Sequence, residues 1–196
     1  MDYTVIGDNV NLGARLCSVA KAGEIILAES ASALLDKDNY ALEKLEPINV
    51  KGKKNKIIIA GNGGSAAIAS HFSVDLTKNA KVRCVNFNES DLITCFSNDY
   101  GYENWVKQTI EFHADKGDLI ILISSSGESR NMLNACKFAL RKKHFPIITF
   151  TGFKKNNSLN KIGHINFWVN SKKYNHVENT HQFLLLSLVD VLKTDD

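Results

Sequence analysis

The sequence contains little of what marks a secreted, membrane-spanning or nucleic-acid-binding protein. Its four cysteines lie far apart without paired spacing, which argues against a disulfide framework or a zinc motif and is typical of reduced thiols. No apolar run approaches the length of a membrane span, and no signal-like segment begins the sequence. The net charge is only +3, and charge alone gives no reason to expect nucleic-acid binding. We therefore expect a cytoplasmic protein that binds neither nucleic acid nor a membrane.

The composition is that of an ordinary globular protein, with 44% hydrophobic and 23% charged residues over 196 positions. The chain reads as two unequal parts, 1–55 and 56–196. In the second part, apolar strand-like segments alternate with helical ones. The predicted strands are 56–60, 82–86, 119–124, 146–150 and 165–169, and the predicted helices are 65–77, 91–96, 102–114, 129–142 and 177–192. This alternation predicts a doubly wound parallel sheet, which binds ligands beyond the carboxyl ends of its strands. The loops expected at that edge are 61–65, 98–101 and 124–129.

A glycine-rich turn follows the first predicted strand. The apolar run 56–60 ends in Gly61-Asn62-Gly63-Gly64-Ser65, and an alanine-rich helical pattern begins at once. Such a turn leaves backbone N–H groups at the positive end of a helix dipole, where an anion binds well. The turn lacks the full GxGxxG spacing, and Asn86, not an acidic residue, ends the next predicted strand. A nucleotide cofactor is therefore not expected.

A second loop, 124–129, follows the same logic after the third predicted strand. It carries four hydroxyl side chains within six positions: Ser124, Ser125, Ser126 and Ser129. One serine before a helix would be an ordinary N-cap. Four of them after a buried strand favour a phosphate site, because each hydroxyl donates to a phosphate oxygen. Together the two loops predict a phosphorylated ligand that is not a dinucleotide.

These segments resemble a sugar isomerase (SIS) domain, close to the phosphoheptose isomerase branch of that family. The resemblance covers residues 56–193 and rests on six blocks: Ala60-Gly-Asn-Gly-Gly-Ser-Ala-Ala67, Ser70-His-Phe72, Ser97-Asn-Asp-Tyr-Gly-Tyr-Glu103, Gly117-Asp-Leu-Ile120, Ile123-Ser-Ser-Ser-Gly-Glu-Ser129 and Glu178-Asn-Thr-His-Gln182. It implies an α/β fold, namely a flavodoxin-like three-layer α/β/α sandwich around a five-stranded parallel sheet. It also implies a homo-oligomer, commonly a tetramer, that converts sedoheptulose 7-phosphate to heptose 7-phosphate.

The resemblance also assigns roles to individual residues. The phosphate would be held by Ser65, Ser124, Ser125, Ser126 and Ser129, with Gly63 and Gly64 in the first loop. Asn62 and Asp99 would line the sugar. His71, Asp75 and Glu178 would be the catalytic groups, and a zinc or other divalent metal ion would be held by His71, Asp75, Glu178 and His181.

The last predicted helix departs from the family pattern in two places. Glu178 stands where the family has glutamine, and Leu186 stands where its catalytic histidine is expected. Leucine neither transfers a proton nor binds a metal ion. Two functions therefore stay open: a sugar-phosphate isomerase, and a SIS module that binds a phosphosugar or docks a protein without turnover.

The first part of the chain resembles something else. Segments 2–16, 22–29 and 45–52 are similar to the C-terminal end of a class III nucleotide cyclase domain, a small α+β fragment. By that resemblance Thr4, Asn11 and Arg15 would face a nucleotide. The two metal-binding aspartates of that family have no counterpart here, so the in-line attack on an α-phosphate would have no metal ion. We expect this fragment to have no cyclase activity.

Overall fold

The structure is a computed structural model, and it describes residues 55–143 and 145–193. The strands are β1 (Ile57–Ala60), β2 (Cys84–Val85), β3 (Leu119–Ser124), β4 (Ile147–Thr151) and β5 (Ile165–Trp168). The helices are α3 (Gly64–Asn79), α4 (Ser90–Tyr100), α5 (Trp105–His113), α6 (Arg130–Lys142) and α7 (Tyr174–Leu192), with a 3-10 turn, η1 (Leu159–Lys161). The predictions for residues 1–54, including the cyclase-like fragment, lie outside the described residues.

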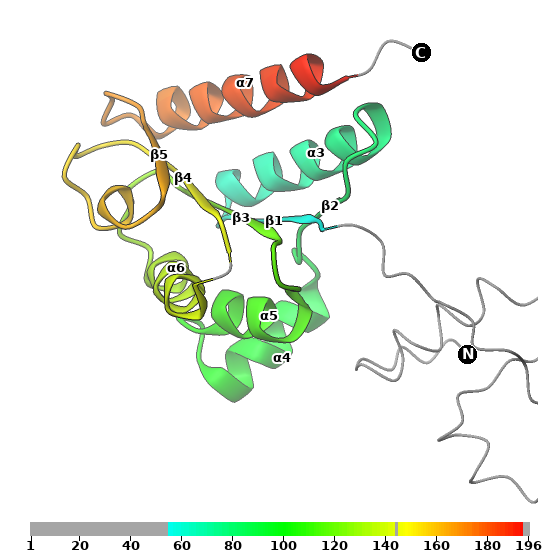
Figure 1. The fold of residues 1–196 in the computed structure, drawn as a ribbon. Helices are drawn as coiled ribbons and strands as arrows, with labels where there is room; N and C mark the ends of the chain where they lie inside the picture. The colour runs from blue at the N-terminus through cyan, green and yellow to red at the C-terminus, as the bar shows by residue number, and fades with distance from the viewer. Residues whose placement is uncertain (1–54, 144, 194–196) are drawn as a thin grey trace, which may run out of the picture. The chain divides into compact units, whose positions relative to one another are not determined.

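The strands form one parallel sheet in the order β2-β1-β3-β4-β5. Helices α3 and α7 cover one face, and α4, α5 and α6 lie on the other (Figure 1). This is the predicted three-layer α/β sandwich, and every predicted strand and helix of the second part is present. The reversal of strand order beside β1 brings the ends of β1 and β3 together at the edge where a ligand site is expected.

The core lies on both faces of the sheet because apolar side chains alternate along its central strands. Ile58, Ile120 and Leu122 pack with Trp105 and Phe138 on the α5 and α6 side. On the other side, Ile59, Ile121 and Ile123 pack with Phe72 of α3 and Leu185 of α7. Strands buried on both faces read as continuous apolar runs, which explains why β1 and β3 were predictable from the sequence.

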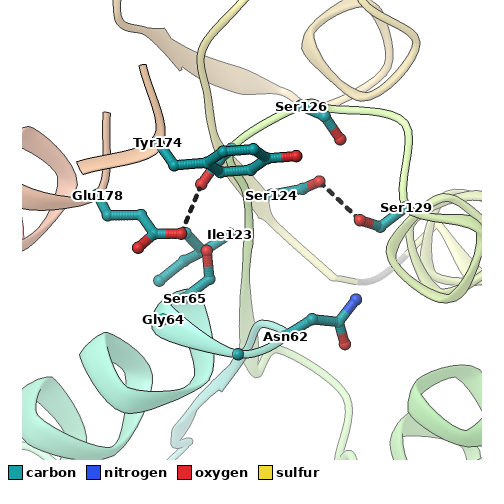
Figure 2. A pocket seen from close by; sticks show the side chains of 11 residues that line it. Asn62, Gly64, Ser65, Ile123, Ser124, Ser126, Ser129, Tyr174 and Glu178 are labelled. Atoms are coloured by element: carbon teal, nitrogen blue, oxygen red, sulfur yellow. Dashed lines mark hydrogen bonds between the residues drawn. The ribbon is translucent and has the colours of Figure 1, made fainter. Parts of the chain in front are cut away.

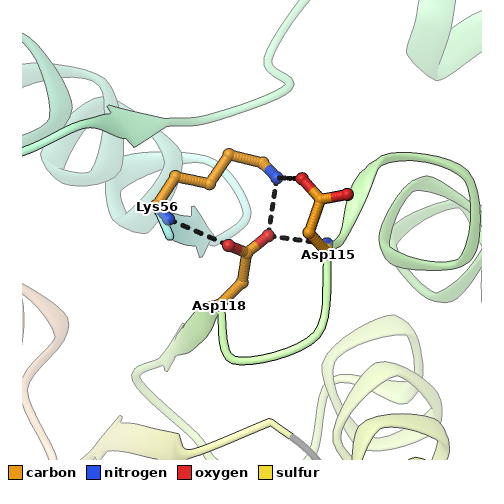
Figure 3. Close-up of polar contacts among 3 residues, drawn as sticks. All are labelled: Lys56, Asp115 and Asp118. Atoms are coloured by element: carbon orange, nitrogen blue, oxygen red, sulfur yellow. Dashed lines mark hydrogen bonds and ion pairs between the residues drawn. The ribbon is translucent and has the colours of Figure 1, made fainter. Parts of the chain in front are cut away.

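An ion cluster ties β1 to β3 at the amino ends of the strands (Figure 3). The Lys56 ammonium lies 2.6 Å from the Asp118 carboxylate and 2.9 Å from that of Asp115. Asp118 is fully buried, and it also accepts the backbone N–H groups of Lys56 and Asp115, each at 2.8 Å. The buried charges of Lys56 and Asp118 are therefore paired, as burial requires, while the Asp115 carboxylate is largely exposed to solvent.

Three boundaries differ from the predictions in ways that affect the site. Helix α7 begins at Tyr174, three residues before the predicted start, so Tyr174 belongs to the helix. Helix α4 continues to Tyr100 and ends at Gly101, whose φ is 83°. The predicted 98–101 loop is therefore mostly helix. Among the described residues, no helix is both long enough and apolar enough to cross a membrane.

Candidate functional site

A cavity of about 310 Å³ opens at the carboxyl ends of β1 and β3 (Figure 2). Its wall is made by the two predicted loops and by the first turns of α7. The lining residues are Asn62, Gly63, Gly64, Ser65, Ile123, Ser124, Ser125, Ser126, Ser129, Tyr174 and Glu178. The structure thus brings together nine of the residues predicted for the site, and it adds Ile123 and Tyr174.

The first loop reaches the cavity by a turn that only glycine permits. A Cβ atom on Gly61 would lie 2.6 Å from the backbone of Ser65, and Gly63 has a φ of 53°. The amides of Ala66 and Ala67 both donate to the Gly63 carbonyl, which begins α3. No side chain caps this helix. The amides of Gly64 and Ser65 therefore stay available at the positive end of the helix dipole.

The second loop holds its hydroxyl groups in a tight turn. The Ser124 hydroxyl donates to Ser129 Oγ at 3.1 Å and accepts the Gly127 amide at 3.2 Å. Gly127 has a φ of 70°, and a Cβ there would overlap the Asn157 side chain. Ser124 and Ser125 are almost fully buried. The loop consequently presents several fixed O–H groups to the cavity just before α6 begins, which is an arrangement suited to an oxyanion.

The Asn62 side chain is fixed by a reciprocal amide pair. Asn62 Nδ2 donates to Asn131 Oδ1 at 3.0 Å, and Asn131 Nδ2 donates back to Asn62 Oδ1 at 2.8 Å. The Tyr102 hydroxyl donates to the same Asn62 oxygen at 3.3 Å. Asn131 is buried in the first turn of α6, directly after the second loop. The pair therefore ties the first loop to the start of that helix. One N–H of Asn62 remains free to donate to a bound molecule.

Glu178 provides the one carboxylate among the residues that line the cavity. Its Oε1 atom accepts a hydrogen bond from the Ser125 hydroxyl at 3.3 Å. The carboxylate lies so close to α3 that a Cβ atom on Gly64 would overlap it. An anion at this place is stabilised by the N-terminus of α3. Among the residues that the structure describes, no lysine, arginine or histidine lines the cavity.

The other predicted site residues lie elsewhere. His71 and Asp75 form an i,i+4 pair on α3 with 3.3 Å between Nε2 and Oδ2, and they are 50% and 32% exposed and outside the cavity lining. Asp99 is exposed on α4, where its carboxylate accepts the Asn98 amide at 2.9 Å. It is outside the lining because α4 extends through the segment that was predicted as a loop.

His181 is fully buried and points into the core. Its ring Nε2 donates to the Thr151 carbonyl at 3.0 Å, and the ring meets Phe150 edge to face. Burial lowers the pKa of His181, which keeps the ring neutral. In the described part of the chain, no three His, Cys, Asp or Glu side chains converge as metal ligands. The four residues predicted to hold a metal ion therefore do not fit one within a single chain.

Sequence reasoning missed Tyr174 because the helix was predicted to begin at Val177. A signal was present in Ser171, a residue type that favours helix starts. Its hydroxyl accepts the backbone N–H of Lys173, the residue just before α7. The buried Asn131, which orients Asn62, carried no recognisable signal, since its role depends on a partner 69 positions away.

The chain is similar to known proteins over most of its length. The SIS domain family matches residues 27–152. The phosphoheptose isomerase of Aliarcobacter butzleri is 35% identical over 161 residues, which are 78% of this chain and 84% of that protein. The phosphoheptose isomerase of Helicobacter hepaticus is 31% identical over 163 residues, 79% of this chain and 82% of that protein.

A solved structure agrees with the sequence relatives. The phosphoheptose isomerase of Neisseria gonorrhoeae superposes with a TM-score of 0.66 at 26% identity, over 70% of this chain and 76% of that one. The family match begins at residue 27, upstream of the predicted domain boundary at 55–56. Residues 27–54 thus fall within the SIS match, and none of these comparisons supports the cyclase resemblance of the first part.

Proposed function

Because the chain belongs to the SIS domain family, we propose that it is a sugar-phosphate isomerase of the phosphoheptose type. It would interconvert sedoheptulose 7-phosphate and heptose 7-phosphate, or carry out a related aldose–ketose isomerisation. The observation that carries the proposal is the cavity, in which the glycine-rich loop 61–65 and the serine-rich loop 124–129 face the Glu178 carboxylate. The curated relatives named above as phosphoheptose isomerases support the same reaction class.

The phosphate group would bind between the two loops. The hydroxyls of Ser65, Ser126 and Ser129 and the first amides of α3 would supply the donors. Because the described residues that line the cavity include no lysine or arginine, the charge of the phosphate would be balanced by dipoles and hydrogen bonds. Hydrogen bonds to a charged group contribute about 1.5–3 kcal/mol each, so several of them suffice for a micromolar site.

The isomerisation would take place at the end of the cavity near Glu178. Aldose–ketose interconversion moves a proton between two adjacent carbons and passes through an enediolate. Glu178 is placed to act as the base, since it is the carboxylate of the cavity and is held by Ser125. The free N–H of Asn62 is a candidate donor to the developing oxyanion, because its amide is oriented before substrate arrives.

No step of this proposal passes through a metal ion. His71, Asp75, Glu178 and His181 were predicted as zinc ligands, but His181 is committed to Thr151 and the α3 pair faces solvent. Those four residues would need a second copy of the chain or a different arrangement to ligate a metal. Assembly into a homo-oligomer, a cytoplasmic location and the absence of cyclase activity stay predictions of the sequence.

A second function is favoured by one specific residue. Leu186 lies two turns after Glu178 on α7, where the family resemblance predicts a histidine. Among the described lining residues, Glu178 is the one carboxylate and no histidine accompanies it. If isomerisation needs such a second proton-transfer group, the site would bind a phosphosugar without converting it. A non-catalytic phosphosugar-binding module is therefore the alternative to the isomerase.

Turnover separates the two functions. The purified chain is incubated with sedoheptulose 7-phosphate, with and without added zinc, and aldose formation is followed while binding is measured by calorimetry. Formation of the aldose supports the isomerase, and saturable binding without turnover supports the binding module. Absence of both would reject the phosphosugar site altogether.

A matched pair of variants assigns the base. Glu178→Gln should lower turnover by about 100-fold to 10,000-fold, which is the usual contribution of a general base, while affinity changes little. Glu111→Gln, on the exposed side of α5, should leave turnover unchanged. Wild-type turnover in Glu178→Gln would remove Glu178 from the mechanism.

A further inference from the structure

Tyr174 is a cavity residue with no assigned role. It is the first residue of α7, and its side chain is 58% exposed although it lines the cavity. Figure 2 shows its ring extending across the cavity near Ser124, with the hydroxyl directed toward the side of Ser126 and Ser129. Within residues 55–143 and 145–193 the hydroxyl forms no hydrogen bond. The ring therefore offers a free phenolic donor on the side of the serine loop.

A second aromatic side chain fixes the position of this ring. Phe153 meets Tyr174 edge to face, with 4.8 Å between the ring centroids and 67° between the planes. Phe153 has a φ of 57°, a left-handed conformation that is unfavourable for an aromatic residue. Its amide donates to the Ser171 carbonyl at 2.8 Å, which ties it to the segment before α7. The surrounding contacts thus hold Phe153 in a strained conformation, and this places its ring against Tyr174.

The same segment is attached directly to the serine loop. The Gly152 amide donates to the Ser125 carbonyl at 3.0 Å. Gly152 also leaves no room for a Cβ atom, because the methyl groups of Val177 on α7 would lie 2.6–2.7 Å from it. The end of β4, the start of α7 and the serine loop consequently pack as one unit. Tyr174 is exposed, yet its backbone is fixed relative to the hydroxyls that face the cavity.

We propose that Tyr174 is a phosphate-binding residue, whose hydroxyl donates to a phosphate oxygen while its ring covers the serine loop. This inference rests on the proposed function, since it takes a phosphosugar as the occupant of the cavity. A phenol suits this role because the lining residues within 55–143 and 145–193 include no lysine or arginine and offer neutral donors. The ring also excludes water on one side, which strengthens the hydrogen bonds of the neighbouring serines.

The test compares Tyr174→Phe with wild type, using sedoheptulose 7-phosphate and inorganic phosphate as ligands in calorimetric titrations. Loss of one donor to a charged group should weaken both ligands by about tenfold and to the same extent. Tyr174→Ala should weaken them further, because the cover over the serine loop is lost as well. Phe153→Ala, which keeps the hydroxyl but removes its support, should fall between wild type and Tyr174→Ala.

Two matched variants serve as controls. Tyr100→Phe removes the hydroxyl of an exposed tyrosine on α4, and Phe183→Ala removes an exposed ring from α7, in both cases outside the cavity lining. Both should bind like wild type. Unchanged affinity in Tyr174→Phe, with binding by wild type intact, would overturn this inference alone. Weakening of the phosphosugar but not of inorganic phosphate would also overturn it. A wild-type chain that binds neither ligand would overturn the proposed function as well.

Discussion

The two ends of the parallel sheet differ in whether their polar groups have partners. At the amino ends, the buried Lys56 ammonium and Asp118 carboxylate compensate each other, with Asp115 beside them (Figure 3). At the carboxyl ends, the Ser126 and Tyr174 hydroxyls and the first amides of α3 face a cavity without such compensation (Figure 2). A compensated cluster stabilises the fold, whereas an array of donors without partners is prepared for a ligand. The contrast distinguishes polar groups that stabilise the fold from polar groups that are available to a ligand.

The sharpest way to break this contrast is to remove a charge from the amino end. Lys56→Met leaves the fully buried Asp118 carboxylate without its cation, so the free energy of unfolding should fall by about 3–5 kcal/mol. Urea denaturation measures it, and phosphate affinity of the folded fraction should stay unchanged.

The control for this variant is a pair of similar chemistry on the surface. Lys107 and Glu111 lie 3.9 Å apart on α5 and are about one third exposed. Lys107→Met should cost no more than about 1 kcal/mol. If Lys56→Met costs as little as Lys107→Met, the cluster at the amino end does not hold the fold.

The second prediction moves to the carboxyl end and concerns Gly64. A methyl group at this position overlaps the Glu178 carboxylate, so Gly64→Ala should displace the proposed base. A misplacement of about 1 Å costs on the order of 100-fold in turnover, and this is the loss expected in kcat. Ala67→Ser is the matched comparison, because Ala67 is exposed on the same helix and lies outside the cavity lining. Equal kcat values in the two variants would show that contact with Glu178 is unimportant.

The third prediction concerns the serine hydroxyls. Ser65→Ala and Ser126→Ala should each weaken phosphosugar binding by about tenfold, since each removes one donor to a charged group. Their free energies of unfolding should change by less than about 1 kcal/mol, because neither O–H group donates to another residue in the described part of the chain. Ser187→Ala on α7, outside the cavity lining, is the control. Calorimetry that finds wild-type affinity in both cavity variants would remove the phosphate assignment.

Much of this contrast could be predicted from the sequence where it depends on local patterns. Strand β3 has the predicted limits, because an apolar run that ends in serines gives both the strand and the loop. The turn after β1 was also predictable, because its glycines mark the end of the apolar run. The prediction from local composition was wrong at Asp99. Residues 98–101 have the composition of a loop, but helix α4 continues through them to Tyr100 and is ended by Gly101.

What could not be predicted depends on contacts between distant segments. Glu178 and His181 are three residues apart on α7, and the sequence suggested that both face the site. The neighbouring strand β4 decides otherwise, because its Thr151 carbonyl accepts the His181 ring and draws it into the core. Tyr174 was missed for a related reason, since Phe153 and Ser171 define where α7 begins.

The smallest expected effect is a pH dependence that comes from His181. Burial lowers its pKa, so below pH 6.5 the unfolded chain takes up a proton that the folded chain refuses. Stability is therefore full above about pH 6.5 and falls as the pH drops, by at most about 1.4 kcal/mol per unit for this group. His113, whose pKa is also lowered by burial, adds a similar dependence.

His181→Gln keeps a donor for Thr151, and its unfolding free energy should fall less than that of wild type between pH 7.5 and 5.5. His176→Gln, which replaces an exposed histidine on α7, should behave like wild type. The same fall in His181→Gln as in wild type would mean that His181 does not titrate with folding and belongs with the groups that face solvent.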